Sequence, residues 1–183
     1  FLPTLTTFVI SVPLSILPAG PVWLIGFIVS GVLIFFVFLS EYVVVDPDAP
    51  YYTLSVAGLT AISYTLFFIL SIALNASGIR LYILLPALFV AAAFTSLRLL
   101  HLWMSGKWEF AWSLGIGLAC VQLAAGLHYW PLTPVQFGLF LIGPLYGLIN
   151  LAINLGENVS LRRATLEPSI VAALCWGLAI FIR

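Results

Sequence analysis

Apolar stretches long enough to cross a lipid bilayer follow one another along the chain, separated by short polar or Gly/Pro-rich turns. A helix needs about 20 apolar residues to cross a hydrocarbon core roughly 30 Å thick. The first stretch is short and contains Pro13, so it either crosses the membrane or lies in its interface. The pattern therefore predicts seven transmembrane helices, or six without the first, at residues 2–17, 22–45, 51–74, 79–104, 109–129, 134–156 and 168–182.

The composition indicates that lipid is the surrounding medium. Of the 183 residues, 63% are hydrophobic and 7% are charged, whereas soluble domains carry about 25% charged residues. The apolar stretches are also too long and too continuous for the alternating strands of about 10 residues in a membrane β-barrel. Because the backbone in lipid must satisfy its own hydrogen bonds, we predict an all-α integral membrane protein. It is a polytopic helical bundle that forms a single domain over residues 1–183.

The positions of the basic residues predict the orientation. Lys107 and the pair Arg162 and Arg163 fall in loops at one end of the bundle, whereas the other end has only Arg80 and the terminal Arg183. Loops rich in Lys and Arg stay in the cytoplasm. The C-terminus is then on the outer face, and the N-terminus is cytoplasmic if the first helix crosses. The net charge is zero and there is no basic tail, so nucleic acid is not an expected partner.

The segment EYVVVDPDAPYY, residues 41–52, holds the only acidic cluster. A calcium loop needs six or more oxygen ligands at regular spacing, and that pattern is absent. We interpret Asp46 and Asp48 as turn and helix-cap residues, with no metal site. Glu41 differs because it lies about one turn inside the predicted helix 22–45. A charge costs up to about 3 kcal/mol at the bilayer centre and less near the interface, so Glu41 should have a partner.

The predicted partner of Glu41 is Arg98, at a similar depth in the helix 79–104. Arg98 and His101 share one helical face, and a second polar face occurs in the helix 134–156. The prediction is a polar cluster in the cytoplasmic half, formed by Glu41, Arg98, His101, Asn150, Asn154 and Glu157.

The predicted cluster has three alternative roles. It locks the bundle by ion pairs and hydrogen bonds, or it binds a lipid or quinone headgroup through Arg98 and His101, or it lies on a proton or ion path. The path is disfavoured because Gln122 is the only strongly polar side chain near the membrane midplane, where transporters place ionisable groups. In the helix 134–156, Gly143 and Gly147 form a small-xxx-small pair that predicts close helix packing.

His101 and His128 are candidate pigment ligands. They end successive predicted helices and should lie roughly 25–30 Å apart, too far to share one iron. Each could bind the magnesium of one pigment, although a lone histidine at the interface more often serves as a hydrogen-bonding residue. Cys120 and Cys175 fit no zinc or disulfide pattern, and we interpret them as buried thiols. The chain has no catalytic motif, so we do not expect an enzyme.

Aromatic residues are abundant for so small a chain, with 14 Phe, 7 Tyr and 6 Trp. Such side chains suit contact with neighbouring helices, pigments or quinones. Together with short loops and no midplane site, they predict a non-catalytic accessory or structural subunit of a multisubunit energy-converting membrane complex. It has no cofactor of its own and contacts membrane lipid and other integral membrane subunits. The alternative is a small membrane transporter or channel.

Three segments of the chain carry a resemblance to known proteins: EYVVVDPDAPYY, LRLLHLW and GLHYW. Over most of its length, the chain resembles a small uncharacterised family of seven-span membrane proteins from phototrophic bacteria. The resemblance implies a place in the bacterial cytoplasmic membrane and an accessory role beside a photosynthetic reaction centre and its light-harvesting antenna. It also implies contact with bacteriochlorophyll, carotenoid, quinone or lipid supplied by partners. It supplies no catalytic residues.

Overall fold

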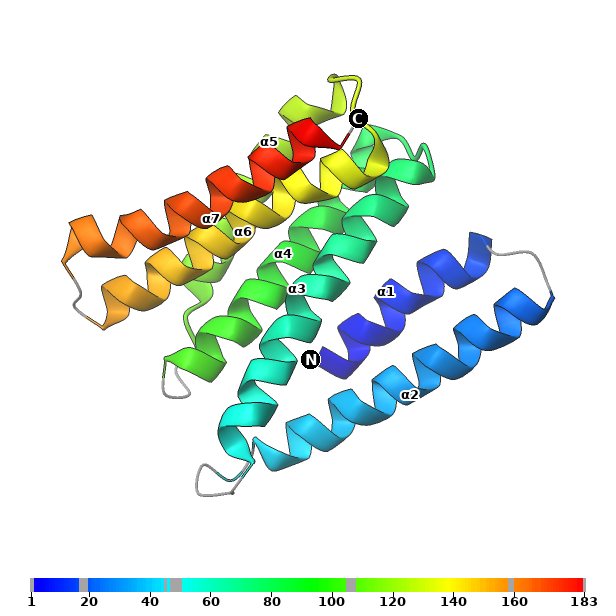
Figure 1. The fold of residues 1–183 in the computed structure, drawn as a ribbon, viewed down its shortest axis with the longest axis horizontal. Helices are drawn as coiled ribbons and strands as arrows, with labels where there is room; N and C mark the ends of the chain where they lie inside the picture. The colour runs from blue at the N-terminus through cyan, green and yellow to red at the C-terminus, as the bar shows by residue number, and fades with distance from the viewer. Residues whose placement is uncertain are drawn as a thin grey trace. The chain divides into compact units, whose positions relative to one another are not determined.

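A computed structural model describes residues 2–16, 20–44, 46, 51–104, 108–157 and 160–182. All the regular structure in these ranges is helical, which confirms the all-α fold (Figure 1). Among the described residues, α2 to α7 are long and apolar enough to cross a membrane, whereas α1 has only 15 residues. The helices are α1 (Leu2–Ile16), α2 (Pro21–Val43), α3 (Tyr52–Ala76), α4 (Leu81–Trp103), α5 (Phe110–His128), α6 (Pro134–Gly156) and α7 (Leu161–Phe181).

The chain divides into two compact units, and the boundary between them lies inside α3. Unit 1 contains residues 1–66, and unit 2 contains residues 67–183. In unit 1, α1 packs along α2 (Figure 1). In unit 2, α6 is the central helix and contacts α4, α5 and α7. The single domain expected from the sequence stays a prediction.

Local chemistry explains where several helices begin and end. Pro21 and Pro134 occupy first-turn positions in α2 and α6, where the missing N–H needs no partner. Thr133 and Gln136 form a capping box at the start of α6, which satisfies two otherwise orphaned backbone N–H groups. After α3, Gly78 has a φ of 61°, a left-handed conformation that glycine adopts without steric cost.

The start of α7 differs from the sequence prediction, which placed residues 157–167 in a loop and began the helix at Pro168. The helix begins at Leu161, seven residues earlier, and Pro168 lies inside it. Leu, Arg, Ala and Glu are favourable helix formers, so this polar stretch continues the helix. Arg162, Arg163 and Glu167 remain exposed, so the charged side chains do not prevent helix formation.

Small residues allow α6 and α7 to approach closely. A Cβ atom added to Gly143 would lie 3.1 Å from Cys175 Cβ and 3.3 Å from the Cα atom of Ala172. One turn further along, Gly147 faces the backbone of Pro168. The Gly143 and Gly147 pair therefore permits the close packing predicted from its spacing, and the partner helix is α7.

A hydrogen-bonded contact joins α4 and α5. The Ser113 hydroxyl of α5 donates to the Ala93 carbonyl oxygen of α4 over 2.5 Å and lies 3.3 Å from the Ser96 hydroxyl. Gly117 continues the same face of α5, and a Cβ atom there would lie 3.3 Å from Ala93 Cβ. Polar small residues of this kind hold membrane helices together where lipid gives no hydrophobic driving force.

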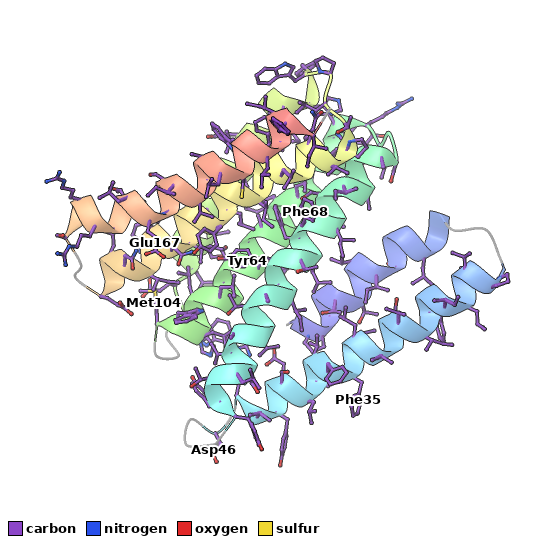
Figure 2. All side chains as sticks on the ribbon, in the orientation of Figure 1. Phe35, Asp46, Tyr64, Phe68, Met104 and Glu167 are labelled. Atoms are coloured by element: carbon purple, nitrogen blue, oxygen red, sulfur yellow. The ribbon has the colours of Figure 1, made fainter. Side chains whose placement is uncertain are left out.

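Two side chains labelled in Figure 2 show how α3 and α4 pack on α6 within unit 2. Phe68 of α3 covers Gly138, where an added Cβ atom would lie only 2.9 Å from the phenyl ring. Met104, just after α4, covers Gly156 at the end of α6. The carboxyl ends of α4 and α6 therefore meet at one end of unit 2.

Candidate functional site

The last turns of α4 carry the polar strip predicted from the sequence. Arg98 and His101 are half-buried, and Thr95 is fully buried. The Thr95 hydroxyl oxygen and His101 Nδ1 are buried without a hydrogen-bond partner in the described part of the chain. The His101 ring stacks on Trp108 with centroids 4.1 Å apart and an interplanar angle of 20°. The strip thus combines a cation with two unsatisfied polar atoms.

The polar residues of α6 lie at the same end of unit 2 as this strip. Asn150 donates from Nδ2 to the carbonyl oxygen of Tyr146 over 3.0 Å, within its own helix. Asn154 is half-buried, and Glu157 is exposed just after the last turn. Because the carboxyl ends of α4 and α6 meet, the structure brings these two parts of the predicted cluster to one end.

Glu41 belongs to the other unit, where it is half-buried in the last turn of α2. Its pairing with Arg98 stays a prediction. Of the other acidic residues in its segment, Asp46 is exposed and Asp48 lies outside the described residues. Within the described ranges, no group of three or more His, Cys, Asp or Glu side chains is placed to hold a metal ion.

The two histidines lie at opposite ends of the α4–α5 pair, as expected for consecutive helices joined by a short turn. His128 Nδ1 is buried without a hydrogen-bond partner among the described residues, and its ring meets Tyr129 edge to face at 5.6 Å. A metal-ligating histidine normally donates its second ring N–H to an acceptor. Neither His101 nor His128 has such an acceptor in the part of the chain that the structure describes, so pigment ligation stays a prediction.

A groove between α5, α6 and α7 was not predicted from the sequence. Its larger hollow has a volume of about 840 Å³, and a second hollow of about 330 Å³ shares Leu123 and Trp176 with it. We call these two hollows together the α5–α6–α7 groove. The larger hollow is lined by Gln122, Leu123, Gly126, Leu127, Trp130, Leu132, Gln136, Phe140, Trp176, Ala179 and Ile180.

One wall of the groove is a row of aromatic rings. Trp130 stacks on Phe140 with centroids 6.3 Å apart, and Phe140 lies 5.9 Å from Trp176. The Trp176 indole N–H donates to the Phe140 carbonyl oxygen over 3.2 Å. That carbonyl has no helical donor because the residue four positions later is Pro144, which lacks an N–H. Trp176 of α7 therefore replaces a hydrogen bond that Pro144 removes from α6.

The two glutamines of the groove differ in their hydrogen bonding. Gln136 is fully engaged: its Oε1 accepts from Thr133 N, and its Nε2 donates to the carbonyl oxygens of Ala179 and Ile182. These bonds tie the end of α7 to the start of α6. The Gln122 amide, in contrast, forms no hydrogen bond with any residue that the structure describes. The sequence indicated that Gln122 is a polar residue at membrane depth, but it did not indicate which helices surround this residue.

Within the described ranges, six helices long and apolar enough to cross a membrane, with exposed apolar flanks, define a polytopic helical integral membrane protein. The chain belongs to the family described as "Protein of unknown function (DUF5656)", whose model matches residues 1–182. The family is one of unknown function, and the multi-span helical membrane character comes from the helices of this chain. Comparisons with curated proteins and with solved structures found no match.

Proposed function

We propose that the protein is a non-catalytic accessory subunit of a multisubunit energy-converting membrane complex. Its helices provide packing surface for partner helices and for pigments or quinone that those partners hold. The single observation that carries the proposal is the surface of α2, a helix whose apolar side chains are almost all exposed.

Val37 is the only buried residue among the 23 of α2, all of which the structure describes. Phe35 is 64% exposed, and the neighbouring Phe36 and Phe38 are 54% and 58% exposed. Figure 2 shows Phe35 projecting outward from the helix. A helix surface that faces only lipid needs no more than Leu and Val side chains. Aromatic rings, in contrast, gain additional energy from packing against other rings and helices. The exposed rings of α2 are therefore available to pack against rings or helices of partner subunits.

The proposed setting follows the resemblance to proteins of phototrophic bacteria. The chain lies in the bacterial cytoplasmic membrane, with the Arg162 and Arg163 end in the cytoplasm and the end of α7 on the outer face. Its partners are the subunits of a photosynthetic reaction centre and antenna, or of a respiratory complex. Exposed aromatic residues at both ends of unit 2, Trp103 and Trp108 at one and Tyr129 and Trp130 at the other, support a membrane-crossing orientation.

A small transporter or channel is the second candidate. The observation that favours it is the buried pair of unsatisfied atoms, the Thr95 hydroxyl and His101 Nδ1, beside Arg98 in the described part of α4. Water or a transported ion would satisfy such atoms. Against a complete path, the sequence predicts only Gln122 as a strongly polar side chain near the midplane, and in the described part of the chain it lines the α5–α6–α7 groove.

Extraction of the tagged chain from its own membrane in a mild detergent tests the accessory role. We expect it to migrate with pigmented or redox-active subunits. Changing Phe35, Phe36 and Phe38 together to Ala should lower the recovered partner at least about fivefold, since aromatic anchors at interfaces are each worth more than about 1 kcal/mol.

The matched control changes Leu114 and Leu118 to Ala, which are also exposed on a spanning helix, α5. This variant should retain the partner. Recovery of the wild-type chain as a monomer or homo-oligomer that moves solute across liposomes would instead establish transport.

A further inference from the structure

We propose that the α5–α6–α7 groove binds a membrane-dissolved molecule with a flat, carbonyl-bearing ring on a long hydrocarbon chain, and that the Gln122 amide donates a hydrogen bond to the ring carbonyl. The groove lies within unit 2 of a single chain. The claim that partner subunits supply this molecule rests on the proposed function. The claim that the groove binds it concerns this chain alone.

Gln122 lies so deep in the membrane that a hydrogen-bond partner of its amide must also lie within the hydrocarbon. Gln122 precedes Trp130 by eight residues, about 12 Å along a helix, and Trp130 is exposed at the end of unit 2, where tryptophans sit at headgroup level. The glutamine side chain is too short to reach that level. An amide without a hydrogen bond in hydrocarbon is strongly disfavoured, so the occupant must bring an acceptor to this depth.

An ordinary phospholipid does not meet this requirement. Its ester oxygens lie near the headgroups, and only CH₂ groups lie at the depth of Gln122. The other side-chain donors of the groove cannot bind the ring carbonyl, because Gln136 Nε2 already donates twice and the Trp176 N–H already donates to Phe140. Gln122 is therefore available to the occupant.

The shape of the groove favours a flat ring with a chain attached. Trp130, Phe140 and Trp176 form an aromatic wall beside the larger hollow, and aromatic faces prefer to pack against other rings. Its volume of about 840 Å³ falls in the range of small-molecule sites. Beyond Trp176, the second hollow continues along α6 as far as Leu151. From Gln136 to Leu151 the groove runs about 22 Å, the length of a long hydrocarbon chain.

The test compares two probes in the purified full-length chain reconstituted in phosphatidylcholine nanodiscs. Decylbenzoquinone carries ring carbonyls, and decylbenzene has the same chain without them. In the wild-type protein, decylbenzoquinone should bind about fivefold more tightly, the effect of one hydrogen bond. In the Gln122→Leu variant, the two probes should bind with about equal affinity, a ratio of about 1. Isotope-edited infrared spectra should show the labelled carbonyl band shifted to lower frequency only in the wild-type protein.

Leu118→Ala, an exposed position of α5 outside the groove, is the matched control and should keep the preference. Thermal unfolding of each variant verifies its fold. Absence of saturable binding, an equal preference in wild type and Gln122→Leu, or retained phospholipid that neither probe displaces would refute the inference. A partner helix seated in the groove would exclude the probes from the native complex and would also refute it. If the wild-type chain binds the probe but does not co-purify with partner subunits, that result would count against the accessory role alone.

Discussion

At the scale of single residues, Trp176 and Pro144 act as a pair. Pro144 removes the donor to the Phe140 carbonyl, and the Trp176 indole supplies another from α7. Trp176→Phe keeps an aromatic ring but leaves the carbonyl unsatisfied. We expect the free energy of unfolding in detergent to fall by about 1 kcal/mol, measured by thermal or denaturant unfolding.

The same substitution in a Pro144→Ala background is the control. The alanine in that background would restore the helical N–H, so Trp176→Phe should then cost close to nothing. An equal loss in both backgrounds would mean that packing of the indole, rather than its hydrogen bond, stabilises the helix pair.

The sequence predicted some of these residue-scale features and missed others, for a physical reason. Gly143 and Gly147 were identified as a close-packing pair because the spacing of small residues along one helix is a local pattern. The contact between Trp176 and Phe140 joins positions 36 residues apart, and no local pattern reports it. Gln122 was recognised as polar at membrane depth, but its place in a groove depends on the positions of α6 and α7.

At the scale of elements, Gln136 links the start of α6 to the end of α7. Gln136→Leu removes the acceptor of the Thr133 N–H and both donors to α7. We expect a loss of about 1–3 kcal/mol in the free energy of unfolding. Hydrogen exchange should become faster at the first turn of α6 and at residues 179–182, as measured by mass spectrometry.

Gln122→Leu is a matched control, since it makes the same chemical change in a neighbouring helix. Gln122 forms no hydrogen bond within the described chain, so this variant should not lose stability. Equal destabilisation by both variants would show that the bonds of Gln136 do not fasten α7.

The boundaries of elements were predicted unevenly. α6 matches the expected range 134–156 because Pro134 and the Thr133 cap give a clear start signal. The start of α7 was placed seven residues late because hydrophobicity, which identifies spans, carries no information about a polar helix turn outside the hydrocarbon. Helix propensity of the sequence LRRATLE was the signal available, and the arginines and Pro168 obscured it.

At the scale of the whole molecule, the distribution of Lys and Arg predicts an orientation that labelling can measure. With Cys120 and Cys175 changed to Ala, single-cysteine variants Tyr129→Cys and Glu157→Cys present thiols at exposed positions at opposite ends of unit 2. A membrane-impermeant maleimide added outside intact cells should label residue 129. It should reach residue 157 only after the membrane is opened, because the end with more Lys and Arg stays in the cytoplasm.

Labelling of residue 157 in intact cells, with residue 129 protected, would reverse the proposed orientation.

The fold class itself was predictable at this scale because lipid leaves a chain few options: each apolar stretch must satisfy its backbone internally and so becomes a helix. The pairing of Glu41 with Arg98 stays a prediction, because the two residues belong to different units.

The boundary inside α3 constrains how the molecule can be dissected. Residues 52–76 form one uninterrupted backbone hydrogen-bond ladder, although they contribute to both units. A cut at residue 67 would expose fresh, unpaired amides and carbonyls in the middle of a span, which hydrocarbon does not tolerate. The smallest fragment that retains unit 2 with intact helices therefore starts at Tyr51. It also includes the part of α3 that belongs to unit 1, about four turns of helix.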